Sequence, residues 1–103
     1  MAAGIRLSQE AVRIIREVTA EVFGPEAEVF LFGSRADPSA KGGDIDLLVE
    51  VPRLPEDWPL RKTLFRAKLK LRLGDQKIDV LVHSRREPKG DFAQRIRLEA
   101  VKL

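Results

Sequence analysis

Two aspartates, Asp44 and Asp46, open a segment that otherwise has the apolar alternation of a strand, Ile45–Val51. Successive side chains of a strand point to opposite faces, so both carboxylates are expected on one face and the aliphatic residues at odd-numbered positions on the other. An apolar face favours burial, but neighbouring carboxylates beside a buried surface repel each other unless a cation compensates. The segment therefore predicts a strand with one face on a core and a cation site on the other.

Apolar periodicity divides the rest of the chain into further elements. The expected order is helix, strand, strand, helix, strand, helix, at about residues 8–23, 28–32, 45–51, 56–73, 77–82 and 90–102. Ser8 is expected to cap the first helix, and Gly74 to end the second. The stripe expected to face the core from the second helix is Leu60, Leu64, Ala67 and Leu71. The inward residues expected near the end of the chain are Phe92, Ile96 and Leu103.

The connections between the three strands predict how they pair. A crossover helix between the second and third strands favours a parallel pair, whereas the loop between the first and second favours an antiparallel pair. This topology brings Gly33 and Ser34, at the end of the first strand, beside Asp44, and it places Asp79 alongside Asp46. The predicted fold class is α/β (α+β), a small mixed sheet of about three to four strands flanked by helices.

Three carboxylates beside a glycine-serine turn match the needs of a magnesium-bound nucleoside triphosphate. Mg²⁺ prefers hard oxygen ligands, usually one or two carboxylates together with waters and substrate phosphates. Asp44, Asp46 and Asp79 are therefore the candidate catalytic residues and ligands of two Mg²⁺ ions, and Asp79 could help to deprotonate an acceptor hydroxyl. The candidate phosphate-binding residues are Gly33, Ser34 and Arg35, which offer close backbone approach, a hydroxyl donor and a guanidinium.

Each of these features alone has an ordinary structural explanation. A Gly-Ser pair commonly marks only a turn, and Asp-x-Asp at the start of a strand is commonly a surface feature. Asp79 could face water from a half-exposed sheet, and Arg35 could be a solvated loop residue. Their joint occurrence on adjacent strand ends, in this order, favours a catalytic site.

The motifs Phe-Gly-Ser-Arg-Ala, Gly-Gly-Asp-Ile-Asp-Leu-Leu-Val and Lys-Ile-Asp-Val-Leu-Val resemble those of the minimal nucleotidyltransferases in the DNA polymerase β-like superfamily. The resemblance implies Mg²⁺-dependent transfer of a nucleoside monophosphate, AMP from ATP, to a hydroxyl acceptor. It implies triphosphate binding by Gly33 and Ser34 and a metal triad of Asp44, Asp46 and Asp79. Many such proteins are antitoxins paired with a helical HEPN-type RNase toxin, and some silence the toxin by adding AMP to a tyrosine. The resemblance therefore implies a partner protein as the acceptor.

The loop between the first two motifs departs from the pattern of that family. Asp37-Pro38 stands where Arg-Gly is usual, and Gly43 replaces a serine. The exchange of a cation for an anion near the phosphates is expected to weaken triphosphate binding. The alternative function is therefore a catalytically weak or inactive module that neutralises its partner by contact.

The composition excludes several classes of protein. The 103 residues contain no cysteine and no apolar run near the roughly 20 residues that cross a bilayer, so we expect a cytoplasmic protein with one domain over residues 1–103. The net charge is +3, and basic residues gather along the second expected helix. The chain nevertheless has no tyrosine for base stacking, so nucleic acid is the least favoured partner. Apolar helix faces also make a homodimer an expectation.

Overall fold

The computed structural model describes residues 5–36, 43–86 and 91–103, with the side chains of residues 34 and 91–94 outside that description. The elements are α1 Gln9–Phe23, β1 Glu28–Phe32, the 3-10 turn η1 Gly33–Ala36, β2 Ile45–Val51, α2 Trp58–Leu73, β3 Ile78–Ser84, α3 Asp91–Glu99 and β4 Val101–Lys102. The expectations for Asp37-Pro38 and for the side chains of Ser34 and Phe92 lie outside the described part. No helix in that part is both long and apolar enough to span a membrane.

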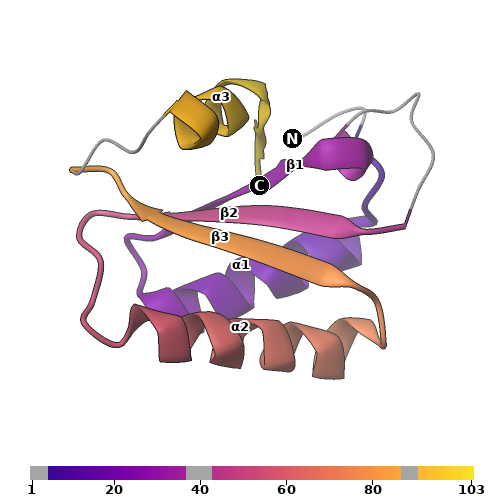
Figure 1. Cartoon of the computed structure of the whole chain (residues 1–103). Helices are drawn as coiled ribbons and strands as arrows, with labels where there is room; N and C mark the ends of the chain where they lie inside the picture. The colour runs from indigo at the N-terminus through magenta and orange to yellow at the C-terminus, as the bar shows by residue number, and fades with distance from the viewer. Residues whose placement is uncertain (1–4, 37–42, 87–90) are drawn as a thin grey trace.

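The strands form one mixed sheet in the order β3-β2-β1-β4. β1 and β2 are antiparallel, whereas β2 and β3 are parallel, with Asp46 opposite Asp79. Both pairings confirm the topology expected from the connections, because α2 forms the crossover between β2 and β3. In Figure 1, α1 and α2 lie together on one face of the sheet and α3 lies on the other. The predicted fold class, a small mixed sheet flanked by helices, is confirmed.

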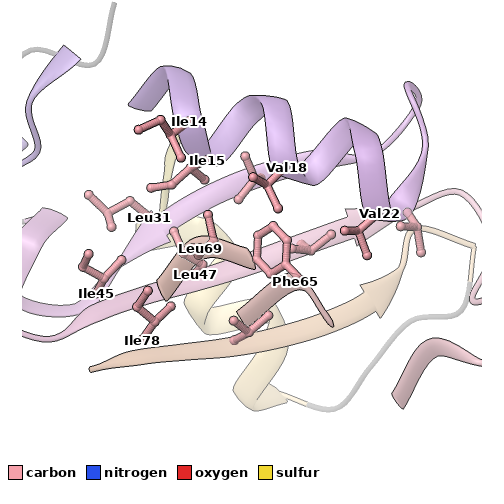
Figure 2. Close-up of a cluster of buried hydrophobic side chains, with 14 residues drawn as sticks. Ile14, Ile15, Val18, Val22, Leu31, Ile45, Leu47, Phe65, Leu69 and Ile78 are labelled. Carbon is pink, nitrogen blue, oxygen red and sulfur yellow. The ribbon is translucent and has the colours of Figure 1, made fainter. Parts of the chain in front are cut away.

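Helix α1 packs on the sheet through one apolar face. Its cap is the expected one, because the Ala11 N–H donates to Ser8 Oγ over 3.0 Å. Its buried apolar residues are Ile14, Ile15, Val18 and Val22. Figure 2 shows these side chains clustered with Leu31, Ile45, Leu47 and Ile78 of the sheet and with Phe65 and Leu69 of α2. The odd-numbered positions of β2 therefore face the core, as the alternation predicts.

Helix α2 faces the core with a different stripe from the one expected. Phe65 and Leu69 are fully buried, and the rings of Phe65 and Phe23 meet edge to face with 5.5 Å between their centroids. The prediction that the other stripe faces the core is wrong, because its side chains point to solvent. Its members are Leu60 (59% exposed), Leu64 (44%), Leu71 (86%) and Ala67, which is also exposed. The helix carries two apolar stripes, and helical spacing alone does not say which one meets the sheet. A phenylalanine ring buries more area than a leucine, which favours the stripe that contains Phe65.

The last helix ends at Glu99 instead of continuing to about residue 102 as expected. Residues 101–102 form β4, which pairs antiparallel with β1, and the Leu103 N–H donates to the Val29 carbonyl over 2.9 Å. Ile96 is buried and Leu103 packs on the core, so both are turned inward as expected. The pairing of β4 with β1 gives hydrogen-bond partners to backbone groups along the outer edge of β1. A helix that continued to residue 102 would leave those groups without these partners.

We expect Phe65→Ala to destabilise the protein by about 3–5 kcal/mol, because it removes a fully buried ring and leaves a cavity between α1 and α2. Leu71→Ala is the matched control, since it truncates a side chain of the same helix that is 86% exposed. The control should change the free energy of unfolding by no more than about 0.5 kcal/mol. Denaturant unfolding measures both values, and equal losses would contradict this orientation of α2.

Candidate functional site

The sheet face opposite α1 and α2 carries three rows of side chains that run across β1, β2 and β3. The rows are Phe32, Asp46 and Asp79; Phe30, Leu48 and Leu81; and Glu28, Glu50 and His83. The middle row is apolar and packs with Ile96 of α3. The first and third rows contain ionisable groups, so chemistry can occur at either end of this face.

The first row brings two carboxylates together, Asp46 and Asp79, called here the Asp pair. Asp46 is half-buried on β2, and Asp79 is exposed on the edge strand β3 directly opposite in the register. Burial raises the pKa of Asp46 above its ordinary value, and the negative charges of Asp79 and then Asp44 raise it further, while Lys77 opposes them. The structure therefore places the two aspartates side by side as the topology predicts. Their role as metal ligands stays a prediction.

Gly33 lies directly against Asp46 at the start of η1. Its φ is +73°, a conformation that residues with a side chain rarely adopt. A Cβ at this position would lie 3.2 Å from Asp46 Cγ and closer still to Oδ2, so glycine leaves the space that this carboxylate occupies. Figure 1 shows that η1 and the starts of β2 and β3 gather at one end of the molecule. Phosphate binding by Gly33 stays a prediction, and the contact that the structure shows is with Asp46.

The guanidinium of Arg35 is bonded to the protein. Nη1 donates to the Arg6 carbonyl over 2.9 Å, and Nη2 donates to the Gly43 carbonyl at 3.0 Å and to Gln76 Oε1 at 3.2 Å. These bonds tie η1 to the residue before Asp44 and to the segment that leads into β3. Arg35 therefore positions the backbone on both sides of the aspartates. Its predicted contact with phosphate is untested, and the side chain of Ser34 lies outside the described atoms.

Asp44 lies immediately before β2 and is 53% exposed, with its Oδ2 3.9 Å from Lys77 Nζ. The Lys77 carbonyl accepts the Ile45 N–H over 3.0 Å, which aligns the starts of β2 and β3. Asp44 is thus close enough to the Asp pair to raise the pKa of Asp46, but its own carboxylate also forms an ion pair with Lys77. Within residues 5–36, 43–86 and 91–103, no group of three or more Asp, Glu, His or Cys side chains is arranged to hold a metal ion.

The chemistry of the donors at this end of the sheet fits a magnesium ion. Asp46 and Asp79 supply hard carboxylate oxygens, and the raised pKa of Asp46 reflects its burial and then the negative charges of Asp79 and Asp44. Asp46 and Asp79 would hold the ion. Coordination by Asp44 as a third ligand stays a prediction, because the described side chains do not form a group of three. A bound divalent cation would remove the repulsion that the protein alone leaves in place.

A second polar cluster, at the opposite end of the same face, was not expected from the sequence. Glu50 is only 5% exposed, and its carboxylate lies 2.8 Å from His83 Nε2 and accepts from Arg97 Nε over 3.1 Å. Arg85 Nε lies 3.5 Å from the same carboxylate. The cluster joins β2, β3 and α3. Its signal in the sequence is the single acid within the apolar run 47–51, because a buried carboxylate needs partners.

Comparison with known proteins agrees with this geometry at the level of the family. Residues 12–103 match the nucleotidyltransferase domain family. The matched span contains all four strands, Gly33 and the Asp pair. No curated protein matches the sequence. The comparisons therefore support nucleotidyl transfer in general, and the acceptor and the partner have to be argued from the chain itself.

We expect Gly33→Ala to displace the Asp46 side chain and to abolish the stabilisation of the protein by Mg²⁺. Gly24→Ala is the matched control, because Gly24 also has a positive φ, +98°, but nothing lies within 4 Å of a Cβ built there. Both variants should lose about 1–3 kcal/mol from backbone strain. Thermal unfolding with and without Mg²⁺ separates them, because only the control should retain the metal-dependent rise in melting temperature. The same response in both variants would remove the structural link between Gly33 and the Asp pair.

We expect Asp46→Asn to stabilise the metal-free protein at neutral pH. The pKa of Asp46 is raised in the folded state, so the charged form is less favourable there than in the unfolded chain. That penalty is complete above the raised pKa and vanishes as the pH falls through it towards the ordinary value of 3.8. Denaturant unfolding as a function of pH should therefore show a gain for the variant at pH 7 that shrinks to nothing below about pH 3.8. A gain that is independent of pH would contradict the electrostatic explanation.

Proposed function

Because this chain belongs to the nucleotidyltransferase domain family, as its match over residues 12–103 shows, we propose that it transfers AMP from ATP to a hydroxyl group of a partner protein. The observation that carries the proposal is the Asp pair, two carboxylates on adjacent strands, of which Asp46 has a pKa raised by burial and then by the negative charge of Asp79. Neighbouring carboxylates that raise one another's pKa in the folded protein are typical of functional sites. The third row of the same face shows the contrast, because buried Glu50 has cationic partners in the chain.

In the proposed reaction the acceptor oxygen attacks the α-phosphorus of ATP, the bond to the β-phosphate oxygen breaks, and pyrophosphate leaves. In this proposal Asp79 accepts the proton of the hydroxyl; its exposure on the edge strand, beside half-buried Asp46, supports that role. Bound Mg²⁺ would neutralise the phosphate charge, and Asp44, Asp46 and Asp79 would hold it. Gly33 keeps space open beside Asp46, and Arg35 fixes the backbone next to the aspartates.

The proposed acceptor is macromolecular because of where the Asp pair lies. Strand β3 is an edge of the sheet, and Asp79 is exposed on it, so a hydroxyl on another protein can approach from outside. We propose a helical partner of the HEPN type, with this chain as the antitoxin that silences it. ATP is available in the cytoplasm, which is where we propose that the protein acts.

A second candidate function, neutralisation of the partner by contact alone, is favoured by the bonding of Arg35. Both terminal nitrogens of that guanidinium already donate to protein acceptors, so the described turn offers a triphosphate fewer free N–H donors than its sequence suggests. The replacement of Arg-Gly by Asp37-Pro38 in the adjoining loop acts in the same direction.

The test is transfer of label from α-labelled ATP to a co-purified helical partner in the presence of Mg²⁺. Asp79→Asn should reduce the rate by about 100-fold or more, because it removes both a ligand and a proton acceptor. Asp75→Asn is the matched control, since Asp75 is an exposed acid close in sequence but outside the first row, and it should keep the full rate.

Two results would count against the enzymatic proposal. One is the absence of label transfer from any of the four nucleoside triphosphates. The other is a double variant, Asp44→Ala with Asp46→Ala, that still neutralises the partner as well as the native chain does. The second result would favour inhibition by contact.

A further inference from the structure

Helix α2 presents a continuous apolar stripe to solvent. The α2 stripe consists of Leu60 (59% exposed), Leu64 (44%), Ala67 and Leu71 (86%). On the same helix Phe65 and Leu69 are fully buried, so the core does not use the stripe. Isolated exposed leucines are ordinary, but a row of apolar residues along one side of a helix is typical of a protein contact.

The spacing of the α2 stripe indicates what kind of element covers it. Leu60, Leu64, Ala67 and Leu71 follow one another at intervals of four, three and four residues, which is the a/d repeat of a helix–helix seam. A seam of this width accepts the side chains of one partner helix between its own. The stripe is therefore matched to a helix.

The helix that carries the stripe is held firmly against the rest of the protein. Lys68 Nζ lies 2.6 Å from Glu21 of α1, and Arg72 Nη2 lies 2.9 Å from Glu17. Arg61 bonds to Asp57 at 2.8 Å and to the Val22 carbonyl at 2.7 Å. A partner helix would meet a surface that needs little reordering, which favours affinity.

The charges of α2 determine the chemistry of the partner. The helix has no acidic residue, and its basic residues are Arg61, Lys62, Arg66, Lys68, Lys70 and Arg72. Arg61, Lys68 and Arg72 pair with acids of this chain, whereas Lys62, Arg66 and Lys70 have no ion-pair partner among the described residues. The flank of the stripe that carries Arg66 and Lys70 is therefore positive and uncompensated.

This charge distribution disfavours both a second copy and a membrane. Two copies of α2 packed along their stripes would bring uncompensated cations together, because neither helix contributes an acid. An anionic membrane would attract Arg66 and Lys70, but the cations on the other flank, Lys68 and Arg72, are already compensated by Glu21 and Glu17 of α1, which leaves few charges for a lipid surface. A helix with acids along one flank matches the single positive flank of the stripe.

We propose that the α2 stripe is the docking surface for an amphipathic helix of a partner protein, with apolar residues at a four-three repeat and acidic residues on the flank that faces Arg66 and Lys70. Helices α2 and α3 lie on opposite faces of the sheet (Figure 1), and the Asp pair is on the face that α3 covers, because it shares that face with Leu48 and Leu81. The docked helix leaves the aspartates uncovered, and the proposal does not depend on catalysis.

The test uses two monomeric, lactam-bridged peptides of three heptads with leucine at the a and d positions, one with glutamate and one with lysine at the flanking positions. Fluorescence anisotropy with the full chain measures binding. The glutamate peptide should bind and the lysine peptide should not. Leu64→Lys and Leu71→Lys should each weaken binding by about tenfold or more, because each places a charge in the seam. The matched control is Leu98→Lys, which changes a leucine of α3 that is 87% exposed and should leave binding unchanged.

A charge reversal tests the choice of partner independently of the apolar contact. The double variant Arg66→Glu with Lys70→Glu should lose the glutamate peptide and bind the lysine peptide. All the substituted side chains are at least partly exposed and lie outside the core, so each variant should fold. Circular dichroism checks that it does.

Four outcomes would overturn the proposal. The first is no binding of the glutamate peptide, and the second is equal binding of the two peptides. The third is a dimer in sedimentation analysis that Leu71→Lys dissociates, which would assign the stripe to a second copy. The fourth is binding to phosphatidylserine vesicles that Leu64→Lys abolishes, which would assign it to a membrane.

Discussion

The parallel pairing of β2 with β3 is the interaction on which the rest of the structure depends. Its register sets Asp46 opposite Asp79 at one end and Glu50 opposite His83 at the other. A slip by one residue would turn Asp79 towards the core and Ile78 and Val80 away from it, so the burial of the aliphatic side chains fixes the position of the acids. Helix α2 makes this pairing possible as the crossover, and its own place is set by Phe65 against α1.

The two polar ends of the exposed sheet face differ in how their charges are compensated. The carboxylate of Glu50 is surrounded by His83, Arg85 and Arg97, and its role is to join α3 to the sheet. The Asp pair has no comparable partner among residues 5–36, 43–86 and 91–103, because Lys77 contacts Asp44 and Arg35 is bonded to backbone and side-chain oxygens. Burial and then repulsion raise the pKa of Asp46, and a perturbed carboxylate of this kind is typical of functional sites.

The sheet separates the proposed chemistry from the proposed contact. The Asp pair faces the side of α3, and the α2 stripe faces away from the other side of the sheet. Helix α2 nevertheless packs against β3, the edge strand that carries Asp79. A partner held on α2 is therefore next to the edge at which its hydroxyl would react. Such an arrangement would raise the effective concentration of the acceptor without covering the aspartates.

Local sequence rules were sufficient to predict the limits of α1, β1 and β2, the Ser8 cap and the pairing of these strands. They were sufficient because alternation, capping and crossover length act over short stretches of chain. The same rules brought the motif around Gly33 and the two facing aspartates together. They chose the wrong stripe of α2, missed β4 and overlooked the partners of Glu50. The sequence by itself determined which residues form helices and strands and where the acids lie along them. Only the tertiary structure decided which face of α2 is buried, how the edge of β1 is paired and which basic side chains surround Glu50. These outcomes depend on competition for contacts between segments that are distant in the sequence.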